Sequence, residues 1–104
     1  METKRFDVSQ EEIEGGLKII VKGHLNAINS DTLEYALDEA FNKGYKRIIL
    51  NMVQVEFLSS SGIRVLLKTY KNMQKNGGIF NIEKPSQNVQ NVLGITALDT
   101  LLLK

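Results

Sequence analysis

Hydrophobic and polar residues alternate along the first part of the chain, between residues 5 and 25. The alternation has the period of two that is typical of strands, and the pair Gly15–Gly16 interrupts it. Glycine pairs favour tight turns, and strands joined this directly pair antiparallel. We therefore expect a hairpin at the start of the chain. The apolar positions of its two strands are Phe6, Val8, Leu17, Ile19 and Val21.

The period then changes to that of a helix, which we expect to begin near Asp31. Apolar residues recur at spacings of three and four, which places them on one face of a helix. Asp31 followed by Glu34 resembles a capping box, Ser30 is a second candidate cap, and Gly44 marks the end. The apolar stripe consists of Leu33, Ala36, Leu37, Ala40 and Phe41.

A second strand and helix follow this first helix. Residues 47–50 are largely apolar and β-branched, which predicts a strand covered on both faces, and alternation continues over residues 53–57. Helical spacing returns from Ile63 to Met73, and Gly77–Gly78 ends it. Three serines and a glycine, residues 59–62, occupy the junction between the strand and this helix.

The last third of the chain predicts one more strand and one more helix. Residues 79–82 form a strand-like run, and Ser86 can cap a short helix that Gly94 stops. For the apolar tail from Ala97 onward we expect a short final strand. The resulting order is β-β-α-β-α-β-α-β, which predicts a single α/β domain over residues 1–104. Its sheet should be mixed but mostly parallel, opened by the hairpin, with helices following the strands.

Composition narrows the possible functions. The 104 residues are 42% hydrophobic, enough for one core, and the absence of cysteine excludes disulfides and thiolate chemistry. The 13 basic and 12 acidic residues give a net charge of +1 without a basic stripe, which argues against nucleic-acid binding. No apolar run is long enough for a membrane span or a secretory leader. We expect a soluble, cytoplasmic protein.

Candidate catalytic groups are sparse. His24 is the sole histidine, which disfavours a hydrolytic triad and a multi-histidine metal site. The chain has no G-x-S-x-G motif and no glycine-rich nucleotide-binding motif. A response-regulator receiver would carry an aspartate after its central strand, where this chain has Asn51. We expect no enzyme, no cofactor and no metal.

The serine junction supports two interpretations. Serine is a preferred helix N-cap, so one hydroxyl could cap the helix while the others have no special role. The N-terminus of a helix also offers unpaired N–H groups and a positive dipole end, which suit a phosphate on a ligand or on a serine. From the residues alone, both interpretations remain open.

Residues 49–67, ILNMVQVEFLSSSGIRVLL, resemble the signature of the STAS family, the anti-sigma factor antagonist domains. The matching features are the aromatic–apolar pair Phe57–Leu58, the S-S-G at residues 60–62 and the aliphatic Ile63. The stretch GHLN at residues 23–26 is similar to the family's G-x-L-D at the end of its second strand. The resemblance extends over roughly residues 5 to 103.

The resemblance implies a bacterial partner-switching protein that regulates transcription. The unphosphorylated domain would bind an anti-sigma factor that is often itself the serine kinase. Phosphorylation of the hydroxyl residue before the glycine, here Ser61, would end the association, and a PP2C-type phosphatase would reset it. Ser60 and Ser59 are the less favoured acceptors, and a monomer or weak dimer is expected. The expected partner-binding residues are Asn26, Phe57, Leu58, Ser59, Ser60, Gly62 and Arg64.

Three positions depart from the family pattern. Asn26, Asn51 and Ser59 stand where aspartate is common, so three negative charges are missing from around the expected site. The short side chains that replace them can still cap a helix or accept a hydrogen bond. The alternative function is therefore a STAS scaffold or small-ligand sensor that is not phosphorylated. An enzyme is a third possibility that would need a recruited cofactor.

Overall fold

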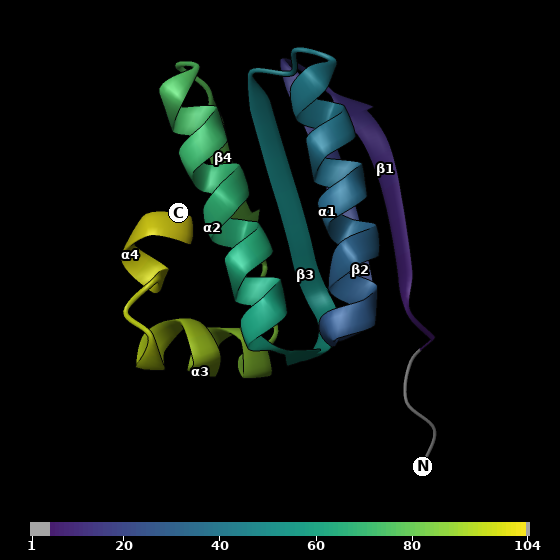
Figure 1. The fold of residues 1–104 in the computed structure, drawn as a ribbon, viewed down its shortest axis with the longest axis vertical. Helices are drawn as coiled ribbons and strands as arrows, with labels where there is room; N and C mark the ends of the chain where they lie inside the picture. The colour runs from purple at the N-terminus through teal and green to yellow at the C-terminus, as the bar shows by residue number, and fades with distance from the viewer. Residues whose placement is uncertain (1–4, 104) are drawn as a thin grey trace.

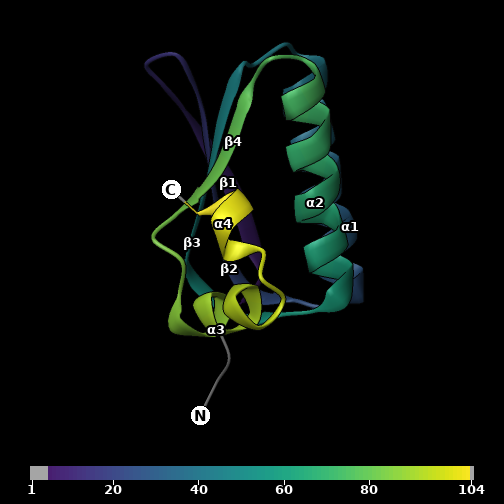
Figure 2. The ribbon, with the colours of Figure 1, turned by 90° about the vertical axis from the view of Figure 1, so that its left-hand side faces the viewer.

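The computed structural model describes residues 5–103, and these form a sheet with two long helices on one of its faces (Figures 1 and 2). Of two shorter helices, one packs against the third strand and the other against the fourth. The elements in chain order are β1 (Asp7–Ile13), β2 (Gly16–Leu25), α1 (Ala27–Asn42), β3 (Arg47–Leu58), α2 (Ser60–Lys75), β4 (Ile79–Glu83), α3 (Gln87–Ile95) and α4 (Asp99–Leu102).

The sheet confirms the predicted mixed, mostly parallel arrangement. Its strands lie in the order β1-β2-β3-β4, antiparallel in the first pair and parallel in the other two. The hairpin closes where Ile13 pairs with Gly16, and Gly15 adopts a φ of 78° in the turn. Glycine is favoured at such a φ because it has no Cβ to clash. Within residues 5–103, no helix has both the length and the apolar character needed to cross a membrane.

The strand β3 is longer than the pattern indicated. The apolar run at residues 47–50 and the alternating segment at residues 53–57 belong to one strand of 12 residues. Only its first part, Arg47 to Asn51, pairs with β4, whereas its pairing with β2 continues to Leu58. The carboxyl end of β3 therefore extends beyond β4. The serines that follow β3 lie at this end of the sheet.

The predicted start of the first helix is wrong. The helix α1 begins at Ala27, and Asn26 caps it, so neither Asp31 nor Ser30 is the cap. The first turn carries no buried apolar residue that would signal it in the sequence, because Ser30 is the residue that turns toward the core there. The hydroxyl of Ser30 is buried without a hydrogen-bond partner among the described residues.

The second and third helices follow the predictions, and the tail does not. Ser59 caps α2 and Ser86 caps α3, and α2 ends just before Gly77. The predicted final strand is wrong, because residues Asp99–Leu102 form a helical turn. Leucine is a good helix former, and the tail retains only one strand-like contact, the bridge from Leu103 to Ile82.

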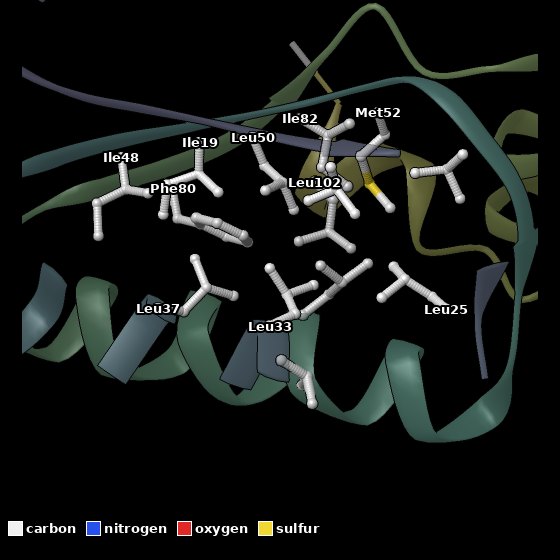
Figure 3. Packing of buried hydrophobic residues seen from close by; sticks show 14 of the residues in the cluster. Ile19, Leu25, Leu33, Leu37, Ile48, Leu50, Met52, Phe80, Ile82 and Leu102 are labelled. Carbon is white, nitrogen blue, oxygen red and sulfur yellow. The ribbon is translucent and has the colours of Figure 1, made fainter. Parts of the chain in front are cut away.

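The core fills the space between the sheet and the two long helices (Figure 3). Inward-facing residues alternate along β2, and helical positions at spacings of three and four meet them from α1 and α2. The opposite face of the sheet carries no helix (Figure 2). That face carries polar side chains such as Lys18 of β2, which pairs with Glu83 of β4 at 3.1 Å. The labelled core residues are Ile19, Leu25, Leu33, Leu37, Ile48, Leu50, Met52, Phe80, Ile82 and Leu102.

Candidate functional site

The candidate site lies at the end of the sheet where the carboxyl ends of β2 and β3 meet and both long helices begin (Figure 1). The two strands are parallel neighbours, so the helices that follow them start side by side. Asn26 accepts a hydrogen bond from the backbone N–H of Asn29 at 2.8 Å. The side chain of Asn29 donates to the carbonyl of His24 at 2.9 Å. These bonds fix the start of α1 to the end of β2.

Ser59 fixes the start of α2 to the same strand end. Its hydroxyl donates to the carbonyl oxygen of Leu25 at 2.5 Å and accepts from the N–H of Gly62 at 3.2 Å. Its backbone N–H also donates to the Leu25 carbonyl, at 3.0 Å. The prediction that a serine caps this helix is confirmed. The Ser59 hydroxyl is thus engaged in both directions.

The next two serines occupy the first two positions of α2. Ser60 is exposed and Ser61 is half-buried, and neither side chain makes a hydrogen bond within residues 5–103. The first N–H groups of a helix have no partner inside the helix, and the dipole there is positive. Ser60 and Ser61 therefore present free hydroxyls where an attached phosphate would be electrostatically favoured.

Gly62 allows the start of α2 to pack closely on the layer below. A Cβ at this position would lie 2.8 Å from Cδ1 of Leu58, and 3.4 Å from both Cβ of Leu25 and the hydroxyl of Ser30. Gly62 is buried, and Leu58 is only 5% exposed. The structure thus places these two predicted partner-binding residues beneath the surface. They lie beneath the turn formed by Ser59, Ser60 and Ser61, the serine turn, and are not available for contact with a partner.

An aromatic pair lies next to the serines on the open side of the sheet. Phe57 is 47% exposed, and its ring centre lies 5.8 Å from that of His24. The Nε2 atom of His24 lies 3.3 Å from a carboxylate oxygen of Glu56. Around the helix starts, Asn26 and Arg64 are also exposed, as expected of contact residues.

Sequence reasoning missed Ile28. This residue lies in the first turn of α1, two residues after the cap, and is 80% exposed. An isoleucine that exposed adds apolar surface beside the serine turn. The signal in the sequence was an apolar residue outside the stripe that begins at Leu33, and it was hidden because the helix was expected to start later.

The structure separates Asn51 from the serine turn. Six residues of extended strand lie between Asn51 and Leu58, which places the two residues about 23 Å apart. Asn51 accepts a hydrogen bond from the N–H of Val53 at 3.1 Å and donates to Glu83 at 3.3 Å. The expectation that all three aspartate replacements surround one site is therefore wrong for Asn51. It holds for Asn26 and Ser59, which cap the two adjacent helices.

Residues 5–103 contain no group of three or more histidine, cysteine or acidic side chains that could hold a metal ion. The pKa values that depart from the ordinary lie elsewhere. A hydrogen bond from Lys68 lowers the pKa of Glu34, and the same contact raises the pKa of Lys68. The chemistry of the candidate site is therefore that of free hydroxyls, helix N–H groups and exposed apolar side chains.

Fold and site together define an α/β domain whose distinctive feature is a serine turn at a helix start, supported by a glycine. Comparison with known proteins identifies the family. Residues 7–103 match the STAS domain family, and the chain belongs to it.

A candidate anti-sigma factor antagonist of Thermotoga neapolitana is 35% identical over 69 residues. That stretch spans 66% of this chain and 61% of the relative, so the match covers less than two thirds of the relative's length. Among solved structures, the anti-sigma factor antagonist SpoIIAA in its unphosphorylated form superposes with a TM-score of 0.81 at 20% identity. The superposition covers 93% of this chain and 86% of SpoIIAA.

The phosphorylated form of SpoIIAA, a Bacillus cell fate determinant, gives a TM-score of 0.74 at 19% identity. It covers 95% of this chain and 89% of that one. At these identities the likeness establishes the fold, and the predicted α/β architecture is confirmed.

Proposed function

We propose that this chain is an anti-sigma factor antagonist that works by partner switching in the cytoplasm. In this proposal the unphosphorylated domain binds an anti-sigma factor, and phosphorylation of Ser61 by a serine kinase ends the association. A PP2C-type phosphatase restores the binding form. The Thermotoga neapolitana relative is a candidate anti-sigma factor antagonist, and the similar structure SpoIIAA is an anti-sigma factor antagonist that exists in phosphorylated and unphosphorylated forms. The observation that carries the proposal is the free Ser61 hydroxyl at the start of α2.

The hydrogen bonds support Ser61 over Ser59 as the phosphate acceptor. The Ser59 hydroxyl donates to Leu25 and accepts from Gly62, and attaching a phosphate to it would break both bonds. Ser60 and Ser61 carry no such constraint. The family motif favours Ser61, because it directly precedes Gly62.

The proposed contact surface comprises exposed residues around the two helix starts. Phe57 and Ile28 supply apolar area, since they are 47% and 80% exposed. Asn26, Ser60 and Arg64 supply polar contacts at its border. Interfaces of this kind depend on a few anchoring side chains, of which aromatic residues and arginine are the most common.

A phosphate on Ser61 would change this surface by charge and by solvation. It adds about −1.5 to −2 charges and three strong acceptor oxygens among residues that the partner must desolvate. Arg64 lies three residues further along the same helix, so its guanidinium can turn to the phosphate and leave the partner. A loss of about 1.4 kcal/mol already weakens binding tenfold. The switch thus requires no rearrangement of the fold.

The test of the proposed modification is mass analysis after incubation with ATP and a cognate serine kinase. Wild type should gain one phosphate that fragment analysis places on Ser61. Ser61→Ala should gain none. Ser60→Ala is the matched control, because it removes a hydroxyl from the same turn and should still be modified. Modification on Ser60 alone would contradict the assignment.

The test of the proposed switch is binding to the anti-sigma factor before and after phosphorylation. Binding by the unmodified protein and its loss in the phosphorylated form are the expected results. An unmodified protein that binds no anti-sigma factor would refute the function. Binding that persists unchanged after phosphorylation would instead indicate the scaffold function.

A further inference from the structure

The outer faces of α1 and α2 carry opposite charges. The helix α1 contains four acidic residues and no lysine or arginine, whereas α2 contains four basic residues and no acidic one. Both helices lie on the same side of the sheet, and no other described element covers them (Figure 2). The acidic residues are Asp31, Glu34, Asp38 and Glu39. The basic residues are Arg64, Lys68, Lys71 and Lys75.

Within residues 5–103, most of these charges form no ion pair. Lys68 alone crosses between the helices, donating to Glu34 at 2.8 Å and to Asp38 at 3.1 Å. Within residues 5–103, Asp31 and Arg64 take part in no ion pair, and both are exposed. Apolar side chains share the same outer faces. Tyr35, four residues after Asp31, is 70% exposed, and Ile28, three residues before it, is 80% exposed.

The outer faces of α1 and α2 each contain a shallow groove. A shallow groove of about 490 Å³ follows the outer side of α2, where Leu67 lies among Arg64, Lys71 and Lys75. A second hollow of about 470 Å³ lies over α1 and is lined by residues that include Tyr35 and Asp38. The outer face of α2 is therefore basic, with the apolar Leu67 lining its groove. The outer face of α1 is acidic and carries the exposed ring of Tyr35.

We infer that this two-helix face binds a second copy of the same chain, with α1 of each copy on α2 of the other. A two-fold axis parallel to the helices produces that pairing, in which each contact occurs twice. A two-fold axis across the helices would instead place acid on acid and base on base. Charge complementarity therefore selects the first arrangement and a second copy as the occupant.

The lengths and starting points of the helices suit this pairing. Each helix has 16 residues, and both start beside the end of β2 and run in the same direction (Figure 1). Ala27 of one copy then lies over Ser60 of the other. This register places Asp31 over Arg64 and Asp38 over Lys71.

The size of the face implies a weak dimer. A helix of 16 residues is about 24 Å long, so two helices about 10 Å wide offer roughly 500 Å² per copy. Stable complexes bury about 800 Å² per partner. Association should therefore depend on concentration, and salt should weaken it because exposed ion pairs are screened.

The test is sedimentation velocity of the full chain from about 10 µM to about 1 mM, at low salt and at about 1 M salt. We expect the average mass to rise with concentration at low salt, and to fall toward the monomer at high salt. Asp31→Arg or Arg64→Asp should each weaken association about tenfold or more, because each replaces two attractions by two repulsions. Glu14→Arg is the control for Asp31→Arg, since it makes the same charge change on the exposed hairpin turn.

Mixing the variants gives the sharpest result. An equimolar mixture of Asp31→Arg and Arg64→Asp should associate like wild type, because the mixed dimer has one ion pair of the native sign and one with reversed signs. The double variant should also associate. A wild-type protein that stays monomeric throughout, or variants that fail to rescue each other, would overturn the inference. Loss of anti-sigma factor binding in variants of a strictly monomeric protein would assign the face to that partner instead.

Discussion

Replacing Ser59 by alanine tests the assignment of this residue to capping. The substitution removes the acceptor for the N–H of Gly62, and losing such a cap costs about 1 kcal/mol. It also removes the hydroxyl bond to the Leu25 carbonyl, which keeps the bond from the Ser59 backbone N–H. That carbonyl is not left unpaired, so the second loss adds about 0.5 kcal/mol. The free energy of unfolding should fall by roughly 1.5 kcal/mol in total.

The assay is urea denaturation followed by circular dichroism. The midpoint should fall while the m-value stays unchanged, because the surface exposed on unfolding is the same. In a thermal scan the corresponding loss in Tm is roughly 6 to 12 °C for a domain of this size. Ser60→Ala is the matched control and should stay within about 0.5 kcal/mol of wild type, since its side chain makes no described hydrogen bond.

An intermediate variant separates the two bonds of Ser59. Asp at this position keeps an acceptor for Gly62 and suits the positive end of the helix. Its carboxylate cannot donate to Leu25, whose carbonyl lies 2.5 Å from the present hydroxyl. Ser59→Asp should therefore fall between wild type and Ser59→Ala. Equal stability of Ser59→Ala and Ser60→Ala would refute the reasoning.

Four further predictions concern the rest of the fold. Ser30→Ala should leave stability unchanged or raise it by up to about 1 kcal/mol in urea denaturation, because the buried hydroxyl has no described partner; a clear loss would reveal a bond to that hydroxyl. Leu50→Ala in β3 should cost about 2–5 kcal/mol in the same assay, because the side chain is fully buried. Lys84→Gly should raise Tm by a few degrees, since Lys84 holds a φ of 46° that favours glycine, and a lower Tm would indicate a side-chain role. The hydrogen bond from Lys68 holds the pKa of Glu34 below its ordinary value of 4.5. The stability from this contact is therefore present above pH 4.5 and is lost as the pH falls through the lowered pKa. An NMR titration should show that the pKa of Glu34 rises in Lys68→Met.

The sequence predicted the features that local chemistry determines. Gly15 marks the hairpin turn, Ser86 caps its helix as expected, and Ser59 supplies the serine cap that was one of the two interpretations of the junction. The turn and both caps depend on backbone groups within three positions, although the Ser59 hydroxyl also donates to the distant Leu25 carbonyl. The mixed, mostly parallel character of the sheet also followed from the alternation of strands and helices, because strands joined through helices pair by right-handed crossovers.

The features that tertiary contacts determine were not predictable in this way. The start of α1 is set by Asn26, and its first turn lacks an inward apolar residue, so helical periodicity begins later than the helix. The burial of Leu58 depends on the close approach that Gly62 permits between α2 and the strand ends. The separation of Asn51 from the serines depends on β3 being a single strand. None of these facts has a signature within a short window of sequence.

The order of the strands has a consequence for how the protein is made. Each strand pairs with the strand that precedes it in the chain, and none is inserted between two others. A ribosome that releases the chain from its N-terminus can therefore add one strand at a time to the growing edge. Only short stretches of chain must close before each new pairing forms, which favours rapid folding. The outer edge of β1 stays open throughout, whereas the growing edge of the unfinished sheet is covered by the next strand in the chain.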